Sequence, residues 1–420
     1  MNRADCAALD QADPLRAHRG AFALPDGVVY LDGNSLGALP RATSARVREV
    51  IEREWGEGLI RAWNSSHWID LPRRVGAKIA RLIGAGSDEV ICADSTSLNL
   101  FKVLATALRL QASRSGGERC VILSERGNFP TDLYMAQGLA NLLGAGHALK
   151  LVEFDEVAAS IDERTAVVML THVNFRTGAM HDMRGIAARA QEAGAVTVWD
   201  LAHSAGAVPV ALNAAGADFA VGCGYKYLNG GPGAPAFVFA AARHLSAIAD
   251  DPFAQPLTGW LGHRAPFMFD ADYAPAASID RYTVGTPSIL ALAALDAGVD
   301  TVLAAGIEGL RAKSTALTEL FIDRVERSCG AQGIGLVSPR DPSRRGSQVC
   351  LRHAHAFPVM QALIARGVIG DFRAPDVLRF GIAPLYVRYV DVWDAVEALR
   401  EVLAGGEWER PEFRQQGAVT

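Results

Sequence analysis

The sequence predicts an α/β fold in which helices cover both faces of a mostly parallel central sheet, with a smaller α+β domain beside it. Short, continuous apolar runs recur through the middle of the chain, and such runs are typical of strands that are buried on both faces. Segments with helical spacing separate these runs, as in chains of strand, helix and strand units. Half of the 420 residues are hydrophobic, so the chain can form the sizeable core that this fold needs.

The first predicted elements are a short strand at 28–31, a turn at 32–35 and a helix over 41–62, where apolar residues recur at helical spacing. An apolar run at 90–92 then leads into a helical pattern that starts near Leu98. From about residue 75 onward, helices alternate with short apolar strands. These strands are expected at 121–123, 166–170, 196–199, 219–221 and 236–239.

A Pro-rich and aromatic stretch at 252–288 interrupts this pattern, and a long helical segment over 288–327 follows it. The remaining pattern predicts strands at 348–352 and 377–382, helices at 358–366 and 390–403, and a loose tail over 408–420. We therefore divide the chain into three parts. They are an N-terminal segment that contributes to the small domain and the functional site, a large α/β domain and a C-terminal small α+β domain, with bounds 1–70, 71–290 and 291–420.

The charge balance excludes several classes of partner. The 41 basic and 46 acidic residues give a net charge of −5, and no basic cluster dominates any region, which argues against binding to nucleic acid or to a membrane surface. Small molecules are the expected partners. The start of the chain, 1–20, lacks a continuous apolar run, and later apolar runs are broken before the roughly 18 residues of a spanning helix. We expect a cytoplasmic protein.

The six cysteines are scattered without a Cys-x-x-Cys pair, so the sequence predicts reduced thiols and neither a disulfide framework nor a zinc site. His353 and His355 would share one face of a strand. Two side chains do not complete the ligand set of a typical metal site. We therefore predict a surface strand there, and no metal.

The most informative stretch is 222–233, Gly-Cys-Gly-Tyr-Lys-Tyr-Leu-Asn-Gly-Gly-Pro-Gly, which follows the strand expected at 219–221. A lone lysine after a strand is usually solvated, but here small and aromatic residues surround Lys226. Burial disfavours the ammonium form of a lysine, and the free amine is a nucleophile that forms a Schiff base with a carbonyl. Asp200 follows the strand at 196–199, so both side chains are expected at one edge of the sheet. A lysine and an aspartate together are what pyridoxal phosphate (PLP) requires.

Polar and aromatic residues near other strand ends are further candidates. Ser95, Thr96 and Ser97 precede a helix, where hydroxyl and free N–H groups either bind an anion or cap the helix. Phe129 and Asp132 follow the strand at 121–123. They either contact a flat aromatic cofactor, by stacking and by hydrogen bonding, or take part in ordinary loop packing.

Two more residues keep alternative interpretations. His203 comes three residues after Asp200, so it is either part of the same site or a satisfied core histidine. Arg379, in the strand expected at 377–382, either forms a bidentate pair with a carboxylate or lies at the domain interface.

Five segments, in this order along nearly the whole chain, resemble the fold-type I PLP enzymes of the aspartate aminotransferase superfamily, and most of all the kynureninase family. The Gly-Asn-Ser-Leu-Gly and Tyr-Lys-Tyr-Leu-Asn segments are specific to that family. The five segments are 30–37 (Tyr-Leu-Asp-Gly-Asn-Ser-Leu-Gly), 129–132 (Phe-Pro-Thr-Asp), 200–206 (Asp-Leu-Ala-His-Ser-Ala-Gly), 225–231 (Tyr-Lys-Tyr-Leu-Asn-Gly-Gly) and 379–386 (Arg-Phe-Gly-Ile-Ala-Pro-Leu-Tyr).

The resemblance implies a role for each matching residue. Lys226 would hold PLP covalently, Asp200 would pair with its ring nitrogen and Phe129 would stack on its ring. The other cofactor contacts within the chain would be Thr96, Ser97, Asp132, Thr171, His203 and Tyr225.

The resemblance also implies a homodimer whose active sites are shared between subunits. Trp260 and Thr286 would contact the phosphate of the neighbouring subunit, and relatives often carry asparagine at the position of Thr286. Arg379 would bind the α-carboxylate of an amino-acid substrate, with Ser35 and Trp63 near the substrate.

The implied activity is hydrolysis of L-kynurenine, and of 3-hydroxykynurenine, to anthranilate or 3-hydroxyanthranilate and L-alanine, in the kynurenine pathway of tryptophan catabolism. Lys226 would act as the base at Cα, and Tyr225 as an acid or base at the γ-carbonyl.

A cysteine desulfurase is the alternative activity, since it shares the fold and the cofactor. It needs a reactive cysteine on a mobile loop, whereas Cys329 and Cys350 are expected at a helix end and in a strand. The intact Lys226 and Asp200 disfavour a non-catalytic, ligand-sensing protein. A nicotinamide-binding fold is disfavoured because no Gly-x-Gly-x-x-Gly follows the first strand of a βαβ unit.

Overall fold

The larger sheet has seven strands in the order β2-β8-β7-β6-β5-β3-β4. The computed structural model describes residues 1–144 and 146–415. Strands β7, β6, β5, β3 and β4 pair in parallel in turn, whereas β8 pairs antiparallel with β7 and with β2. The predicted mostly parallel sheet is therefore confirmed. The strand bounds are β2 (Val90–Cys92), β3 (Val121–Glu125), β4 (Ala148–Val152), β5 (Thr165–Thr171), β6 (Val196–Asp200), β7 (Phe219–Gly222) and β8 (Phe237–Ala240).

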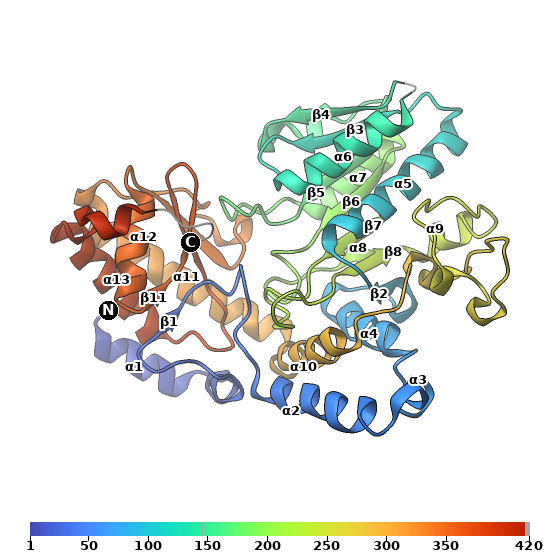
Figure 1. Ribbon diagram of the computed structural model, residues 1–420. Helices are drawn as coiled ribbons and strands as arrows, with labels where there is room; N and C mark the ends of the chain where they lie inside the picture. The colour runs from blue at the N-terminus through green and yellow to red at the C-terminus, as the bar shows by residue number, and fades with distance from the viewer. Residues whose placement is uncertain (145, 416–420) are drawn as a thin grey trace.

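Helices pack on both faces of this sheet (Figure 1). Along β5, Val167 and Met169 face one hydrophobic cluster, while Val168 and Leu170 face another. The first cluster includes residues of α5 and α6, and the second includes residues of α4 and α7, which explains why the central strands read as continuous apolar runs. The helices around the sheet are α4 (Leu71–Ile83), α5 (Thr96–Ser115), α6 (Pro130–Leu143), α7 (Met183–Ala193), α8 (Leu212–Ala215) and α9 (Ala242–Ala247).

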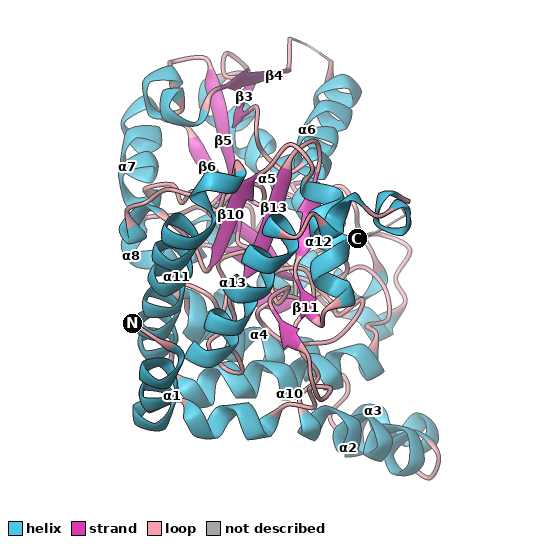
Figure 2. Cartoon of the chain, turned by 90° about the vertical axis from the view of Figure 1, so that its left-hand side faces the viewer, coloured by secondary structure: helices cyan, strands magenta, loops and turns pink. Residues whose placement is uncertain are grey.

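A second, antiparallel sheet has the strand order β12-β13-β10-β9 and forms the core of the smaller lobe, together with α1, α11, α12 and α13 (Figures 1 and 2). The N-terminal segment joins this lobe, because β1 (Val29–Tyr30) pairs in parallel with β11 (Val368–Ile369). The remaining bounds are α1 (Arg3–Ala12), α11 (Ile307–Cys329), β9 (Gly335–Leu336), β10 (Gln348–Arg352), α12 (Ala356–Ala365), β12 (Asp371–Arg373), β13 (Val377–Gly381) and α13 (Tyr389–Ala404).

Two long predicted helices are broken. The segment over 288–327 is two helices, α10 (Ile289–Ala305) and α11, which are bent by 79° at Gly306. Gly306 has φ +76°, a conformation that favours glycine. Among the described residues no single helix could cross a membrane; only this bent pair meets the length and composition criteria together.

The predicted helix over 41–62 is also interrupted. It consists of α2 (Arg41–Glu49), a turn of π-helix over 50–55, a short 3-10 turn and α3 (Ala62–Ser65). Gly56 and Gly58 fall between these pieces, and glycine is a poor helix former. The edge strand β4 was not predicted. It is only partly buried, and Lys150 interrupts its apolar residues, so it does not form a continuous apolar run like the central strands.

The C-terminal expectations need correction. Strand β10 ends at Arg352, so His353 and His355 do not lie on a surface strand, and His353 is buried. The tail over 408–420 is not loose in its described part, since Trp408 stacks on His355 with 4.4 Å between ring centroids. Short 3-10 turns continue to Arg414, and 416–420 lie outside the described residues.

Candidate active site

A cavity of about 730 Å³ opens at the carboxyl ends of the parallel strands. The segments that follow β2, β3, β5, β6 and β7 all contribute to its wall, as expected for the binding edge of an open α/β sheet. Every cofactor contact predicted within the chain lines it: Thr96, Ser97, Phe129, Asp132, Thr171, Asp200, His203, Tyr225 and Lys226. Of the two residues predicted to reach the neighbouring subunit, Thr286 also lines the cavity of its own chain, whereas Trp260 does not.

Lys226 lies in the glycine-rich loop after β7. Its Nζ is 3.1 Å from Nε2 of His203 and 5.7 Å from the centroid of the Tyr225 ring. The loop is closely packed against the N-terminal segment, since the Gly37 N–H donates to the Tyr225 carbonyl at 2.8 Å. A Cβ atom at Gly37 would come within 2.4 Å of the Lys226 carbonyl oxygen, so only glycine fits there. Two distant segments thus hold the lysine in place.

Asp200 is the last residue of β6 and is buried. Its Oδ1 accepts the Ala202 N–H at 2.8 Å. Burial raises the pKa of the Asp200 carboxyl, and the positive charge of Lys226 opposes that effect. The site therefore holds a carboxylate that is costly to keep charged unless a cationic partner faces it.

Asp132 and His203 are two further buried titratable groups of the cavity. Burial, followed by the charge of Asp200, raises the pKa of Asp132 well above its ordinary value, while the Thr171 hydroxyl donates to Asp132 Oδ2 at 3.3 Å. Burial, followed by the charge of Lys226, lowers the pKa of His203 well below its ordinary value. Both effects favour the neutral imidazole, and the buried Nδ1 of His203 has no hydrogen-bond partner among the described residues.

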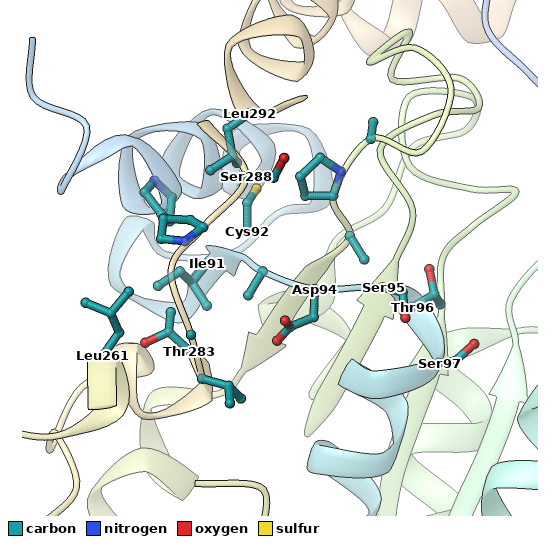
Figure 3. A pocket seen from close by; sticks show the side chains of 18 of the residues that line it. Ile91, Cys92, Asp94, Ser95, Thr96, Ser97, Leu261, Thr283, Ser288 and Leu292 are labelled. Atoms are coloured by element: carbon teal, nitrogen blue, oxygen red, sulfur yellow. The ribbon is translucent and has the colours of Figure 1, made fainter. Parts of the chain in front are cut away.

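The first turn of α5 forms one end of the cavity (Figure 3). Ser95 is the N-cap and accepts the Leu98 N–H at 3.4 Å, so the capping interpretation holds for this residue. The side chains of Thr96 and Ser97 line the cavity at the helix start, where free N–H groups and the helix dipole favour an anion. Ser95 thus caps the helix, while the side chains of Thr96 and Ser97 are left facing the cavity.

Phe129 supplies an apolar wall. Phe129 directly precedes α6 and lines the cavity. Its ring packs edge to face on the ring of Phe175, with 5.3 Å between the centroids, and the residue is still 42% exposed. A large aromatic ring that remains this exposed on a cavity wall can accept a stacked planar ligand.

The donor set of the cavity fits PLP. Lys226 provides the amine, Asp200 a buried carboxylate that a protonated ring nitrogen would stabilise, and Phe129 an open aromatic face. The α5 N-terminus offers the anion end. The orphaned Nδ1 of His203 is a further buried polar atom that a ligand can satisfy.

Three predicted substrate residues lie outside this cavity lining. Arg379 is 1% exposed and is bound by Asp371, and Ser35 contacts the same pair. Trp63 packs edge to face on Trp68, 6.0 Å away between centroids, in a separate small cluster.

Phe175 connects Arg379 to the cavity, because this residue lines the cavity and its carbonyl accepts a hydrogen bond from Arg379 Nη1 at 2.7 Å. Phe175, Asp371 and Arg373 were not among the residues predicted for the site. The alternation of Asp371 and Arg373 along one strand was a usable signal, since both side chains then share a face.

Comparison with solved structures supports the fold. A cysteine desulfurase from Thermococcus onnurineus NA1 superposes with a TM-score of 0.75 at 19% identity, over 93% of this chain and 98% of that one. A C-DES mutant with glycine covalently linked to its PLP cofactor gives 0.74 at 15% identity, over 91% and 99%. The chain therefore has the fold of the fold-type I PLP enzymes.

Comparison of sequences narrows the class to a family. A family model described as the kynureninase C-terminal domain matches residues 310–399. A kynureninase of Burkholderia mallei (strain SAVP1) is 54% identical over 100% of this chain and 99% of that protein. One of Pseudomonas fluorescens is 52% identical over the same shares. The chain belongs to the kynureninase family.

Proposed function

We propose that this chain is a PLP-dependent hydrolase that cleaves L-kynurenine, and 3-hydroxykynurenine, to anthranilate or 3-hydroxyanthranilate and L-alanine, in the kynurenine pathway of tryptophan catabolism. The observation that carries the proposal is full-length identity of 52–54% to kynureninases, combined with a cavity that brings Lys226 and Asp200 together. The six free, buried cysteines are compatible with a cytoplasmic location.

Each cavity residue would contact a different part of the cofactor. Lys226 would bind it covalently, Asp200 would face its ring nitrogen and Phe129 would stack on its ring. Thr96 and Ser97 would hold the phosphate at the α5 N-terminus. When bound, PLP supplies an electron sink for negative charge at the substrate Cα. Asp132, Thr171 and His203 would complete the pocket around it.

The same residues can move the protons that the reaction requires. The Lys226 amine would take the proton from Cα, and Arg379 would orient the α-carboxylate, with Ser35 beside it. Burial raises the pKa of the Tyr225 phenol, so Tyr225 would begin as the acid at the γ-carbonyl. Water adds to that carbonyl carbon, the Cβ–Cγ bond breaks, and Cβ takes up a proton. One water is consumed, and anthranilate and alanine leave.

The direct experiment is to incubate the purified holoenzyme with L-kynurenine and to follow anthranilate fluorescence, with Lys226→Ala as the control. Fluorescence with the wild type alone supports the proposal. A cofactor-loaded wild type that forms neither anthranilate from L-kynurenine nor 3-hydroxyanthranilate from 3-hydroxykynurenine contradicts it. Cysteine is the third substrate to test, because release of its sulfur would favour the desulfurase alternative. The likeness to desulfurase structures shows the fold alone, and every cysteine in the described residues is buried.

We further propose a homodimer in which Trp260 and Thr286 of one subunit complete the phosphate site of the other. Trp260 is 39% exposed and lies on a loop whose exposed apolar side chains also include Phe267, Met268 and Phe269. An apolar surface of this kind favours burial against another chain.

Mixing two inactive variants tests the shared site. Lys226→Ala carries one defect, and Trp260→Ala with Thr286→Ala carries the other. If the site is shared, each mixed dimer has one intact site, so activity should recover to about a quarter of the wild type after random subunit exchange. Absence of recovery, with mixed dimers demonstrated by differential tags, would contradict sharing.

A further inference from the structure

Asp371 binds two arginines at once at the predicted substrate-carboxylate site. Arg379 Nε donates to Asp371 Oδ1 at 2.7 Å, and Arg379 Nη2 pairs with Asp371 Oδ2. The same Oδ2 accepts from Arg373 Nη2 and from the Ser35 hydroxyl, both at 2.7 Å. Asp371 and Arg379 are each 1% exposed, so this bidentate pair is shielded from water.

The hydrogen bonds of Arg379 leave little room for a second carboxylate. A guanidinium has five N–H donors. Nε and Nη2 bind Asp371, Nη2 also donates to Ser35 Oγ at 2.8 Å, and Nη1 donates to the Phe175 carbonyl at 2.7 Å. One Nη1–H remains, whereas bidentate recognition of a carboxylate needs two parallel donors. A substrate carboxylate therefore competes with Asp371 for Arg379.

Arg373 lies where it can pair with Asp371 once a substrate carboxylate has taken the place of Asp371 on Arg379. The two residues lie two positions apart on β12, so their side chains share a face. The Arg373 side chain is 36% exposed, and its Nε makes no hydrogen bond to a described residue. Asp371 can thus turn from Arg379 to the Nε and Nη2 fork of Arg373 while it stays paired.

The charges of the cluster agree with such an exchange. Two arginines face Asp371, which leaves one positive charge for an incoming carboxylate. Asp32 is the other acidic neighbour. Burial, followed by the charge of Asp371, raises the pKa of Asp32 above its ordinary value, which favours the uncharged carboxyl beside Asp371.

On the basis of the proposed function, we propose that Asp371 is a place-holder for the substrate α-carboxylate: the substrate displaces it from Arg379, and Arg373 accepts it. Arg373 is then a positioning residue that sets substrate affinity without touching the substrate. No bond changes in this step, since one carboxylate replaces another on the Arg379 fork.

Without the Arg373 guanidinium, Asp371 should stay bound to Arg379. We expect Arg373→Gln to raise KM about tenfold with little change in kcat, because a charge-assisted hydrogen bond that helps Asp371 to leave is lost. The dissociation constant of L-alanine, measured by calorimetry on the holoenzyme, should rise by the same factor. Arg373→Lys should recover part of the affinity. Arg352→Gln, which removes an exposed arginine from strand β10, is the matched control.

The double variant Arg373→Gln with Asp371→Asn tests whether Arg373 acts through Asp371. Adding Asp371→Asn to Arg373→Gln removes the competing carboxylate, so KM and the alanine dissociation constant should fall back towards the wild type. If Arg373 binds the substrate directly, or if the cluster only stabilises the fold, the second substitution restores nothing and the proposal is wrong. Melting temperatures of the unliganded variants identify a folding defect. A wild type that forms no anthranilate overturns the proposed function instead, and the alanine titration still tests the exchange.

Discussion

The Lys226→Ala protein is expected to lose at least about 10³-fold in kcat with L-kynurenine, because the substitution removes the proposed covalent hold on the cofactor and the base at Cα together. The visible absorption of the bound cofactor should change with it. After borohydride reduction, peptide mapping of the wild type should place the cofactor on Lys226. Added small amines should restore part of the activity to the variant, since an amine of suitable size can enter the space that the side chain leaves.

Lys150→Ala is the matched control for this experiment. Its amine lies at the surface, where both partners of its ion pair with Asp162 are 42% exposed, so activity should not change. Reduction that labels another lysine, such as the buried Lys102, would contradict the assignment of Lys226. Full activity of the Lys226→Ala protein would do the same.

The cavity residues were predictable because they follow strands whose patterns are strong. Asp200 comes directly after a continuous apolar run, and Lys226 lies in a loop marked by glycines, so the sequence indicates both the strand ends and the shared sheet edge. The parallel sheet then brings together groups that are distant in sequence, without any detailed knowledge of packing.

The Arg379 cluster was only partly predictable for the opposite reason. Asp371 meets Arg379 through the antiparallel pairing of β12 with β13, and Phe175 meets it from a loop of the other lobe. Neither β12 nor the relative position of the lobes is visible in local periodicity, because β12 has only three residues. The break at Gly306 is similar: helical patterns continue on both sides, and a single glycine does not by itself predict a turn of 79°.

Asp200→Asn should lower kcat by about 10³-fold while the protein stays folded. An asparagine cannot carry the negative charge that keeps a ring nitrogen protonated, so the electron sink weakens and the loss falls on the chemical step. Asp132→Asn is the comparison variant, since Asp132 is a buried carboxyl of the same cavity with a raised pKa. Because Asp132 is not assigned to the ring nitrogen, its substitution should cost less in kcat. Equal losses would contradict the assignment of Asp200.

The stability of the cofactor-free protein gives an independent test of Asp200. Here Asp200→Asn is expected to be favourable, whereas the same substitution lowers kcat. Burial raises the pKa of Asp200 in the folded chain, so the folded state holds this proton more tightly than the unfolded state, and stability is lost as pH rises from the ordinary carboxyl range through the raised pKa. Asp200→Asn removes that cost. The cofactor-free variant should therefore melt at or above the wild type at pH 8, and the difference should vanish near pH 4. Added PLP should then stabilise the wild type more than the variant, because only the wild type offers the cationic ring nitrogen its carboxylate. A variant that is less stable without cofactor at both pH values would instead make Asp200 a structural residue of β6.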